Sequence, residues 1–303
     1  MSKSIDTLVP DIYDVFLKPH EISQENLDAL GDNLKNCVKD AIVKAGEKRV
    51  PTLRMSVIGK PDRQIWYELN SKDTTKVTEF GDLDVFEPNP EKYLKFLFGN
   101  ILEELLVFLI KESGHSFAYA QEEVNIDGVL GHTDGVIDRV VSDIKTSSSF
   151  QFRNKWLNRS LLKSKENDPF GYVGQIAGYH QELLKKYPDD VDPENVAWLV
   201  FNKETGELLL VKADTMELIN AEDRVSHLKK LLSKTTPPPE KCFTESTHDN
   251  GNREIHKSCG YCAFKTECYK SSNNGQGLRK FKYSNGIKYL SHVNKLPKVE
   301  EII

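Results

Sequence analysis

The chain has 303 residues, of which 38% are hydrophobic and 29% charged, and its net charge at pH 7 is −5. This composition indicates a soluble globular protein with more than one minimal domain, and it excludes a uniformly basic coat for nucleic acid but not a local basic groove. The longest apolar run, residues 105–110, is too short to cross a membrane, and residues 1–6 carry no secretion signal. We therefore expect no membrane partner.

The first third of the chain shows mainly helical patterns. An amphipathic helix is expected over residues 22–49, and a short strand pair within 52–67. The acidic, proline-bearing segment 82–90 indicates a boundary. Beyond it a long helix is expected over 91–112, with Gly114 as its stop signal.

The middle of the chain alternates between strands and helices. Its expected elements are strands around 116–126, 133–137 and 140–146, a helix from about 172 to 186, a hairpin formed by 197–201 and 207–211, and a helix over 215–232 that three prolines close off. The resulting organisation is a mostly helical N-terminal region at 1–90, a core at 91–235, a cysteine module at 236–270 and a tail at 271–303.

Residues 131–150 form the most informative segment, G-H-T-D-G-V-I-D-R-V-V-S-D-I-K-T-S-S-S-F. If positions 138–139 form a two-residue hairpin turn, Asp134 lies directly opposite Asp143 on the same face. Asp-Arg is not the Asn-Gly type that favours the tightest hairpins, so this register is an inference. Like charges placed opposite each other destabilise a sheet, and a fold that keeps such a pair usually holds a cation between them.

Lys145 follows two residues after Asp143 and shares its face of the strand, whereas the Ile144 side chain points the other way, towards a core. Two carboxylates and water suit Mg²⁺. A lysine beside the ion would orient or deprotonate the attacking water and offset negative charge in the transition state of phosphoryl chemistry. The alternative is an exposed hairpin with a polar face.

The G-x-x-D and D-I-K-T motifs of this hairpin resemble the core of PD-(D/E)XK nucleases, particularly the RecB-like exonuclease branch. Three further motifs of that branch occur in the expected order between residues 94 and 269. They are G-x-x-x-E at 99–103, Q-x-x-x-Y at 175–179, and the C-x2-C-x5-C of Cys259, Cys262 and Cys268, which is similar to the iron–sulfur members. Each motif alone is weak, but the ordered set is specific.

The resemblance implies a restriction-endonuclease-like α/β core, with a mixed central sheet flanked by helices, and Mg²⁺- or Mn²⁺-dependent cleavage of DNA. Exonuclease action is expected over endonuclease action. The implied metal ligands are Asp134, Asp143 and the Ile144 carbonyl with Glu103 in support, and the other catalytic residues are Lys145, Gln175 and Tyr179. The four-residue spacing from Gly99 favours Glu103 over the alternative, Glu104, because a small residue lets the helix approach the sheet closely. From spacing alone, Tyr179 is equally compatible with a core position.

Residues 151–165 carry basic and aromatic side chains and only one charge type, which suits phosphate binding and base stacking. The alternative is a solvated basic loop. The candidate DNA-binding residues are Arg153, Lys155, Trp156, Arg159 and Lys163.

Cys259, Cys262 and Cys268 are spaced to chelate one metal centre, which needs a fourth ligand. Cys242 is the nearest candidate, Cys37 is the alternative that the resemblance offers, and His256 would complete a Cys3His zinc site. The resemblance favours a 4Fe-4S cluster over Zn²⁺. Its expected role is structural, and redox chemistry is not required. Clustered cysteines in this number suit a reducing cytoplasm.

These features predict a DNA exonuclease of recombination, repair or phage genome processing, acting on linear duplex or single-stranded ends in a bacterial or phage-infected cytoplasm. A helicase or single-strand annealing protein is a candidate partner. The alternative is a non-catalytic DNA-binding or interaction protein on a nuclease fold.

Overall fold

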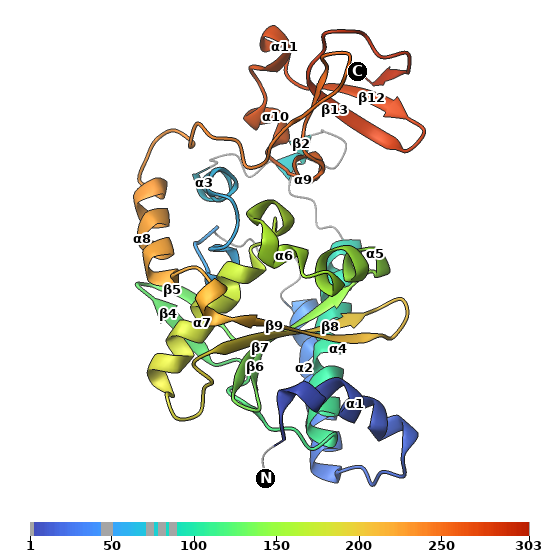
Figure 1. Ribbon diagram of the computed structural model, residues 1–303, viewed down its shortest axis with the longest axis vertical. Coiled ribbons are helices and arrows are strands. Elements are labelled where there is room, and N and C mark those ends of the chain that lie inside the picture. The colour runs from blue at the N-terminus through green and yellow to red at the C-terminus, as the bar shows by residue number, and fades with distance from the viewer. Residues whose placement is uncertain (1–2, 44–50, 71–75, 78–82, 85–89, 303) are drawn as a thin grey trace. The chain divides into compact units, whose positions relative to one another are not determined.

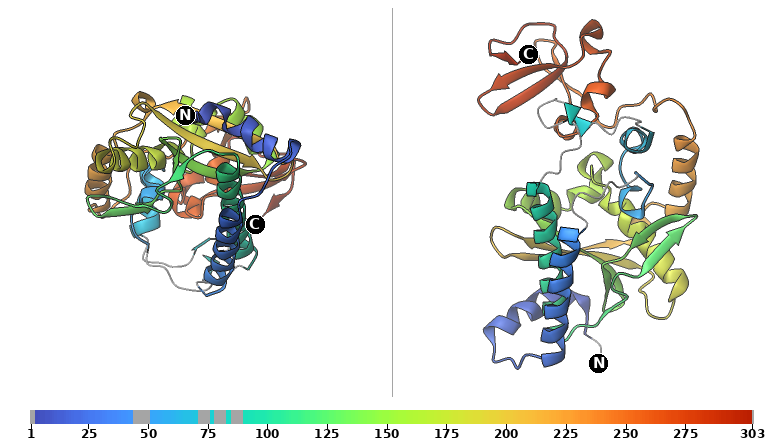
Figure 2. Two further views of the ribbon diagram at one scale, coloured as in Figure 1. Left: turned by 90° about the horizontal axis from the view of Figure 1, so that it is seen from below. Right: turned by 180° about the vertical axis from the view of Figure 1, so that it is seen from behind.

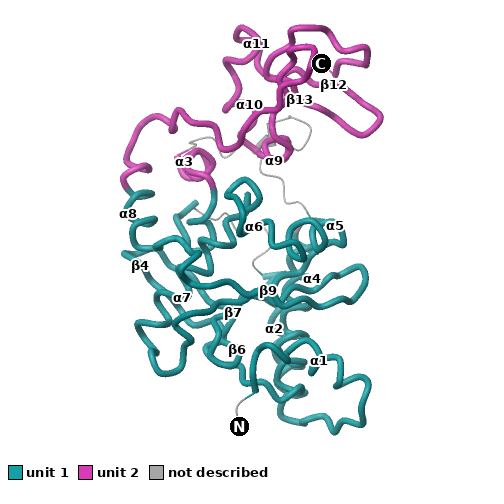
Figure 3. Tube along the Cα trace, in the orientation of Figure 1, with its two compact units in different colours: residues 1–60, 88–229 teal, residues 61–87, 230–303 magenta. Residues whose placement is uncertain are grey.

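The computed structural model describes residues 3–43, 51–70, 76–77, 83–84 and 90–302. The chain divides into two compact units (Figure 3), each taken by itself below. Unit 1 comprises residues 1–60 and 88–229, and unit 2 comprises residues 61–87 and 230–303. The predicted N-terminal region is therefore shared between them, because residues 1–60 belong with the central core and residues 61–87 with the cysteine-bearing part.

The centre of unit 1 is a five-stranded mixed sheet in the order β3-β6-β7-β8-β9 (Figure 1). β7 and β8 are parallel, and all other neighbours are antiparallel. A parallel pair needs a crossover, which the helix α7 supplies between β7 and β8. The strands are β3 (Phe117–Ala118), β6 (Gly135–Ile137), β7 (Val140–Ser147), β8 (Asn195–Asn202) and β9 (Leu208–Asp214), and α7 is Tyr172–Lys186.

Helices α1 and α4 pack on one face of this sheet. Apolar residues of both helices form one buried core with the sheet, in which the side chain of Ile144 also lies. Helix α2 runs beside α4, as the views of Figure 2 show. The bounds of these helices are α1 (Leu8–Leu17), α2 (Gln24–Val43) and α4 (Pro90–Glu112).

The hairpin between β6 and β7 has the predicted register. Asp138 and Arg139 both have positive φ, 46° and 74°, as a two-residue turn of this hand requires, and Ile137 pairs with Val140. The right-handed twist of the strands outweighs the poor intrinsic fit of this dipeptide. The expected α/β class with a mixed central sheet is confirmed, and so are the helix over 172–186 and the hairpin of β8 and β9.

Two local predictions were wrong or incomplete, and a third stays a prediction. The segment 52–67 contains no strand pair but the short helix η2 and the start of α3. A two-stranded hairpin of β4 and β5 was missed within 123–132. The predicted boundary at 82–90 falls mostly outside the described residues. The elements concerned are η2 (Met55–Val57), α3 (Asp62–Asn70), β4 (Glu123–Ile126) and β5 (Val129–His132).

The rest of unit 1 consists of short elements around the sheet and one helix that reaches the unit boundary. They are η1 (Ile5–Thr7), α5 (Ser149–Gln151), the π-helix η3 (Phe152–Leu157), α6 (Ser160–Lys163), η4 (Lys165–Asn167), η5 (Thr215–Glu217) and α8 (Ala221–Leu232).

Unit 2 contains α3 and a second antiparallel sheet in the order β10-β11-β13-β12-β14. The segment expected as a tail therefore supplies three of the paired strands. Besides α3, the elements of unit 2 are β1 (Lys76–Val77), β2 (Leu83–Asp84), β10 (Ser246–Thr247), β11 (Arg253–Glu254), α9 (Lys257–Gly260), α10 (Lys265–Cys268), α11 (Ser272–Gly275), β12 (Arg279–Tyr283), β13 (Gly286–His292) and β14 (Glu301–Ile302). In the described part of the chain, every helix is too short or too polar to span a membrane.

Candidate active site

The two aspartates of the hairpin meet at the end of β6. Asp143 lies within β7 and is fully buried, and Asp134 directly precedes β6. Because β6 begins only at Gly135, the backbone N–H of Ile144 has no strand partner there and donates instead to Oδ2 of Asp134 at 2.7 Å. One carboxylate is thus fixed by the backbone of the strand that carries the other.

Lys145 is the cation nearest to this pair. Its Nζ lies 2.8 Å from Oδ1 and 2.7 Å from Oδ2 of Asp143, but only Oδ1 accepts with hydrogen-bond geometry. Oδ2 of Asp143 is buried without a hydrogen-bond partner among the described residues. The ammonium group of Lys145 offsets the charge of this oxygen, which retains acceptor capacity for a further ligand.

Helix α4 brings Glu103 to the same place. The charges of Asp134, Lys145 and Asp143 all act on the Glu103 carboxyl. Glu104 instead faces α2, where its Oε2 accepts from Nδ2 of Asn33 at 2.7 Å. Of the two adjacent glutamates, the structure therefore brings Glu103 to the aspartates. We call Glu103, Asp134, Asp143 and Lys145 the carboxylate centre.

The carboxylate centre has more negative than positive charge. Burial and the neighbouring carboxylates raise the pKa of both Glu103 and Asp143, although Lys145 opposes the shift. Burial lowers the pKa of Lys145, but Asp143 and Asp134 outweigh it and the net shift is upward, so this lysine stays protonated. Three carboxylates share one ammonium group, and in a poorly solvated site the excess is relieved by protons or by a hard cation.

Helix α7 lines the centre from the face of the sheet opposite to Ile144. Nε2 of Gln175 donates to Oη of Tyr179 at 2.9 Å, and both side chains are buried. Burial raises the pKa of the Tyr179 phenol, and the charges of Asp143, Asp134 and Lys145 also act on it. The ring centroid of Tyr172 is 5.4 Å from Nζ of Lys145. Tyr172 was not predicted, because a single aromatic residue at the start of a helix gives no sequence signal.

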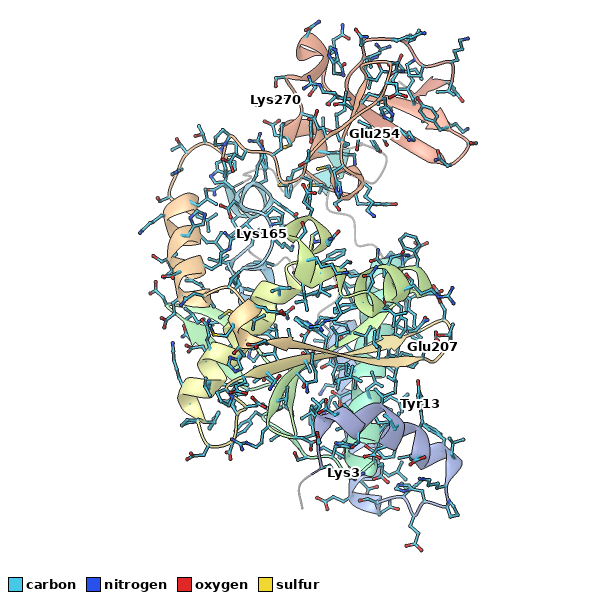
Figure 4. All side chains as sticks on the ribbon, in the orientation of Figure 1. Lys3, Tyr13, Lys165, Glu207, Glu254 and Lys270 are labelled. Atoms are coloured by element: carbon cyan, nitrogen blue, oxygen red, sulfur yellow. The ribbon has the colours of Figure 1, made fainter. Side chains whose placement is uncertain are left out.

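The basic segment after β7 is divided between surface and interior. Arg153, Arg159 and Lys163 are exposed, and Figure 4 labels Lys165 close to them in the chain. Lys155 and Trp156 are only 6% and 2% exposed, so as they lie in the structure they offer no surface to DNA. The six-residue π-helix is responsible, because it turns both side chains inward beneath α7.

Unit 2 gathers four of the five cysteines around one pocket. Cys242, Cys259, Cys262 and Cys268 line it together with residues of α3 and the aromatic rings of the module. Burial raises the pKa of Cys242 to about 11 and that of Cys259 to about 12, so both are neutral thiols at pH 7. We call this the cysteine pocket. Its lining residues are Arg63, Gln64, Tyr67, Cys242, Phe243, Cys259, Cys262, Phe264, Lys265, Cys268 and Tyr269.

Each sulfur of the pocket has a hydrogen-bond donor. Nε of Arg63 is 3.1 Å from Sγ of Cys268, and Oη of Tyr269 is 3.9 Å from Sγ of Cys259. The backbones of Gln64 and Phe264 hydrogen-bond Cys242 and Cys262, respectively. Donors around every sulfur, one of them a guanidinium group, suit thiolates more than neutral thiols. The part played by Arg63 was not foreseen, since it lies some 180 residues before the first of these cysteines.

The other two candidates for a fourth ligand lie elsewhere. Cys37 is in α2 of unit 1, where burial and the charges of Glu104 and Glu103 raise the pKa of its thiol. His256 caps α9 by accepting from the Ser258 N–H, and its ring stacks on Phe243. The structure thus places Cys242, and neither Cys37 nor His256, with the three cysteines of the motif.

Across the described ranges, no three or more His, Cys, Asp or Glu side chains stand as a ready-made metal site. At the carboxylate centre the reason is visible, because Lys145 and the Ile144 N–H occupy oxygens of the two aspartates. Metal ligation would require Lys145 to withdraw from Asp143.

Comparison with known proteins adds little. No family model matches the chain, and no curated protein matches it. A solved structure described as the crystal structure of SSO0001 is 16% identical, with a TM-score of 0.38, and the match covers 77% of this chain and 93% of that one. Similarity at this level carries no argument about fold family or function, which therefore rest on the residues themselves.

Proposed function

We propose that the chain is a metal-dependent deoxyribonuclease of the PD-(D/E)XK type, on the RecB-like exonuclease branch, acting in recombination, repair or phage genome processing in a bacterial or phage-infected cytoplasm. The observation that carries the proposal is the carboxylate centre. Four residues from three separate motifs, the outermost of them 42 positions apart in the chain, meet at the buried carboxylate of Asp143.

The donor set of the centre fits Mg²⁺ or Mn²⁺. Asp134, Asp143 and Glu103 would hold the ion with the carbonyl of Ile144, which shares with the Ile144 N–H the strand edge left open where β6 begins. When bound, the ion would supply Lewis-acid polarisation of the phosphate and a bound water of lowered pKa. A divalent charge would also relieve the excess of negative charge.

The protein's own residues would do the remaining work. Lys145, released from Asp143, would hold the attacking water and offset negative charge that develops on the phosphate. The buried hydrogen bond from Gln175 to Tyr179 would keep that side of the site rigid. Exposed Arg153, Arg159 and Lys163 follow directly after the catalytic strand and would contact the DNA backbone, so their contribution would weaken with salt. A helicase or annealing protein would supply the ends.

For unit 2 we propose a bound 4Fe-4S cluster, with Zn²⁺ as the alternative, held by Cys242, Cys259, Cys262 and Cys268. The support is that four cysteines, the number of ligands that both groups take, line one pocket, although their sulfurs do not stand as a ready-made site among the described residues. The donors to each sulfur would stabilise the thiolates that either group requires. Its role would be structural, joining α3 to the C-terminal module within unit 2.

The test uses anaerobically purified protein with end-labelled linear DNA and covalently closed circular DNA, in Mg²⁺ or in EDTA, next to Lys145→Ala. Mg²⁺-dependent loss of linear DNA alone, absent in the variant, is the expected result. Cleavage of the circle would make the protein an endonuclease. Binding without cleavage in every condition would favour the alternative, a non-catalytic DNA-binding protein on a nuclease fold.

A further inference from the structure

Lys155 occupies an unusual environment for a lysine. It is 6% exposed, and its Nζ has no hydrogen-bond partner among the described residues. Three aromatic rings surround the ammonium group, with centroids 4.1 Å (Tyr172), 5.2 Å (Phe170) and 5.4 Å (Trp156) from Nζ. Lysine is almost never buried unless it is paired, and Lys155 has one acidic partner.

The nearest opposite charge is Asp168, whose Oδ1 is 3.6 Å from Nζ of Lys155 and is itself buried without a hydrogen bond. The other oxygen of Asp168 accepts from the Val173 N–H at 2.9 Å, in the first turn of α7. Asp168 therefore ties Lys155 to the start of the helix that carries Gln175 and Tyr179. The backbone that supplies Lys155 is a π-helix, a form found frequently at functional sites.

The Tyr172 ring joins Lys155 to the carboxylate centre. Nζ of Lys145 lies 5.4 Å from the centroid of this ring and Nζ of Lys155 lies 4.1 Å from it. The ring also stacks on Trp156, at 5.5 Å between centroids, which limits its movement. A change at Lys155 would therefore reach Lys145 through a single intervening side chain.

We propose that Lys155 is a positioning residue, whose ammonium group, held by Asp168, keeps the Tyr172 ring against Lys145 and so sets the direction in which Lys145 presents its Nζ. Its attraction to the ring faces and to Asp168 depends on the positive charge, and the neutral amine would hold the ring less firmly. The catalytic part of this inference rests on the proposed nuclease function. The packing part does not.

The charged groups that face Lys155 act in both directions. Burial lowers its pKa to about 8, with Asp168 opposing and Lys145 adding to the shift. Tyr172 stays neutral over the same range, because burial raises the pKa of its phenol to about 12. Lys155 therefore loses its charge as the pH rises through about 8, and the ring should loosen in the same interval.

The first experiment follows Lys145 itself, by NMR of protein with ¹³C-labelled lysine, in EDTA and without DNA. The ε-methylene signal of Lys145, assigned with Lys145→Arg, should show a ring-current shift at pH 7. In Lys155→Met, where an apolar chain of similar length fills the aromatic site without charge, this shift should shrink. Lys203→Met, which removes an exposed lysine in the β8–β9 turn, is the matched control and should leave the shift unchanged.

The second experiment measures cleavage kinetics between pH 7 and 9.5. Lys155→Met should lower kcat about tenfold with KM changed less than about twofold, since the residue does not touch substrate. Lys155→Arg, which stays charged, should restore kcat and keep it above pH 8, where the natural protein declines.

The outcomes separate the two proposals. An unchanged Lys145 signal in Lys155→Met, or a shifted signal with full kcat, would overturn the positioning role. A shifted signal in a protein that never cleaves DNA would uphold the contact between the two lysines through Tyr172 and reject the nuclease proposal instead.

Discussion

The two units each collect side chains of the types that ligate metals, but the charge of these side chains is controlled differently in the two. The carboxylate centre carries its own cation, Lys145, which partly neutralises Asp143. In the cysteine pocket, which also contains the Arg63 guanidinium group, burial keeps Cys242 and Cys259 as neutral thiols. Ionised carboxylates repel one another, so without a metal they need a counter-charge. Thiols avoid this repulsion because they stay protonated. We therefore expect unit 1 to fold without metal and unit 2 to depend on it.

The largest effect is expected from removing a ligand of the cysteine pocket. Structural metal sites of this class contribute on the order of 10 kcal/mol to folding. Cys262→Ala should therefore lose the bound iron or zinc, and protease should then cut unit 2 while unit 1 stays intact. Metal content, visible absorption and limited proteolysis measure this. Cys37→Ala is the matched control, and equal metal content in both variants would contradict the assignment.

A large effect on function alone is expected at the carboxylate centre. Asp143→Asn keeps the shape of the side chain but removes the charge that holds metal and Lys145, so cleavage should fall at least about 1,000-fold. DNA affinity and the melting temperature should hardly change. Exposed Asp189→Asn serves as the control. Full activity in Asp143→Asn would reject the site.

A moderate, pH-dependent effect is expected from Glu103→Gln. The native pKa of Glu103 is raised above its ordinary 4.5, so the native state binds more protons than the unfolded one, and this contribution to stability is lost as the pH rises from 4.5 through the native pKa. In EDTA the natural protein should lose roughly 1–3 kcal/mol over that interval, and Glu103→Gln should lose less, because of these two carboxyls only Asp143, whose pKa is also raised, then contributes.

Chemical denaturation at several pH values measures this difference. Glu104→Gln is the control, because Glu104 bonds Asn33 outside the centre. Mg²⁺ should abolish the decline in the natural protein, since the ion replaces the protons. A parallel decline in both variants would show that Glu103 is not the residue responsible.

The smallest effect is expected from Tyr179→Phe. The change leaves the buried Gln175 amide without its acceptor and should cost about 1–2 kcal/mol of stability. Tyr187→Phe removes a more accessible hydrogen bond, to Glu122, and should cost less. Equal losses of stability in thermal denaturation would mean that the Gln175–Tyr179 hydrogen bond does not keep this side of the carboxylate centre rigid.

The sequence predicted the carboxylate centre unusually well, because its geometry is mostly local. Asp134, Asp143 and Lys145 lie within twelve positions, and a two-residue turn with alternating side chains fixes their relation. Helix α7 was predicted with its full length because its apolar residues repeat at helical spacing over fifteen positions.

Features that depend on contacts between distant segments could not be predicted from the sequence in this way. The spacing from Gly99 favoured Glu103 over Glu104, but the outcome depends on how α4 packs between α2 and the sheet. The inward turn of Lys155 and Trp156 depends on a π-helix, which composition does not indicate. A lysine in a basic segment looks solvated until its packing is known.

The sequence by itself thus determined the alternation of elements, the register of the hairpin of β6 and β7 and the presence of ligand-type side chains on it, because these follow from periodicity and near neighbours in the chain. Tertiary structure alone decided which cysteine joins the motif, which glutamate faces the aspartates, and which basic residues remain at the surface. These outcomes depend on burial and on contacts between segments far apart in the chain, and such contacts form only when the chain folds.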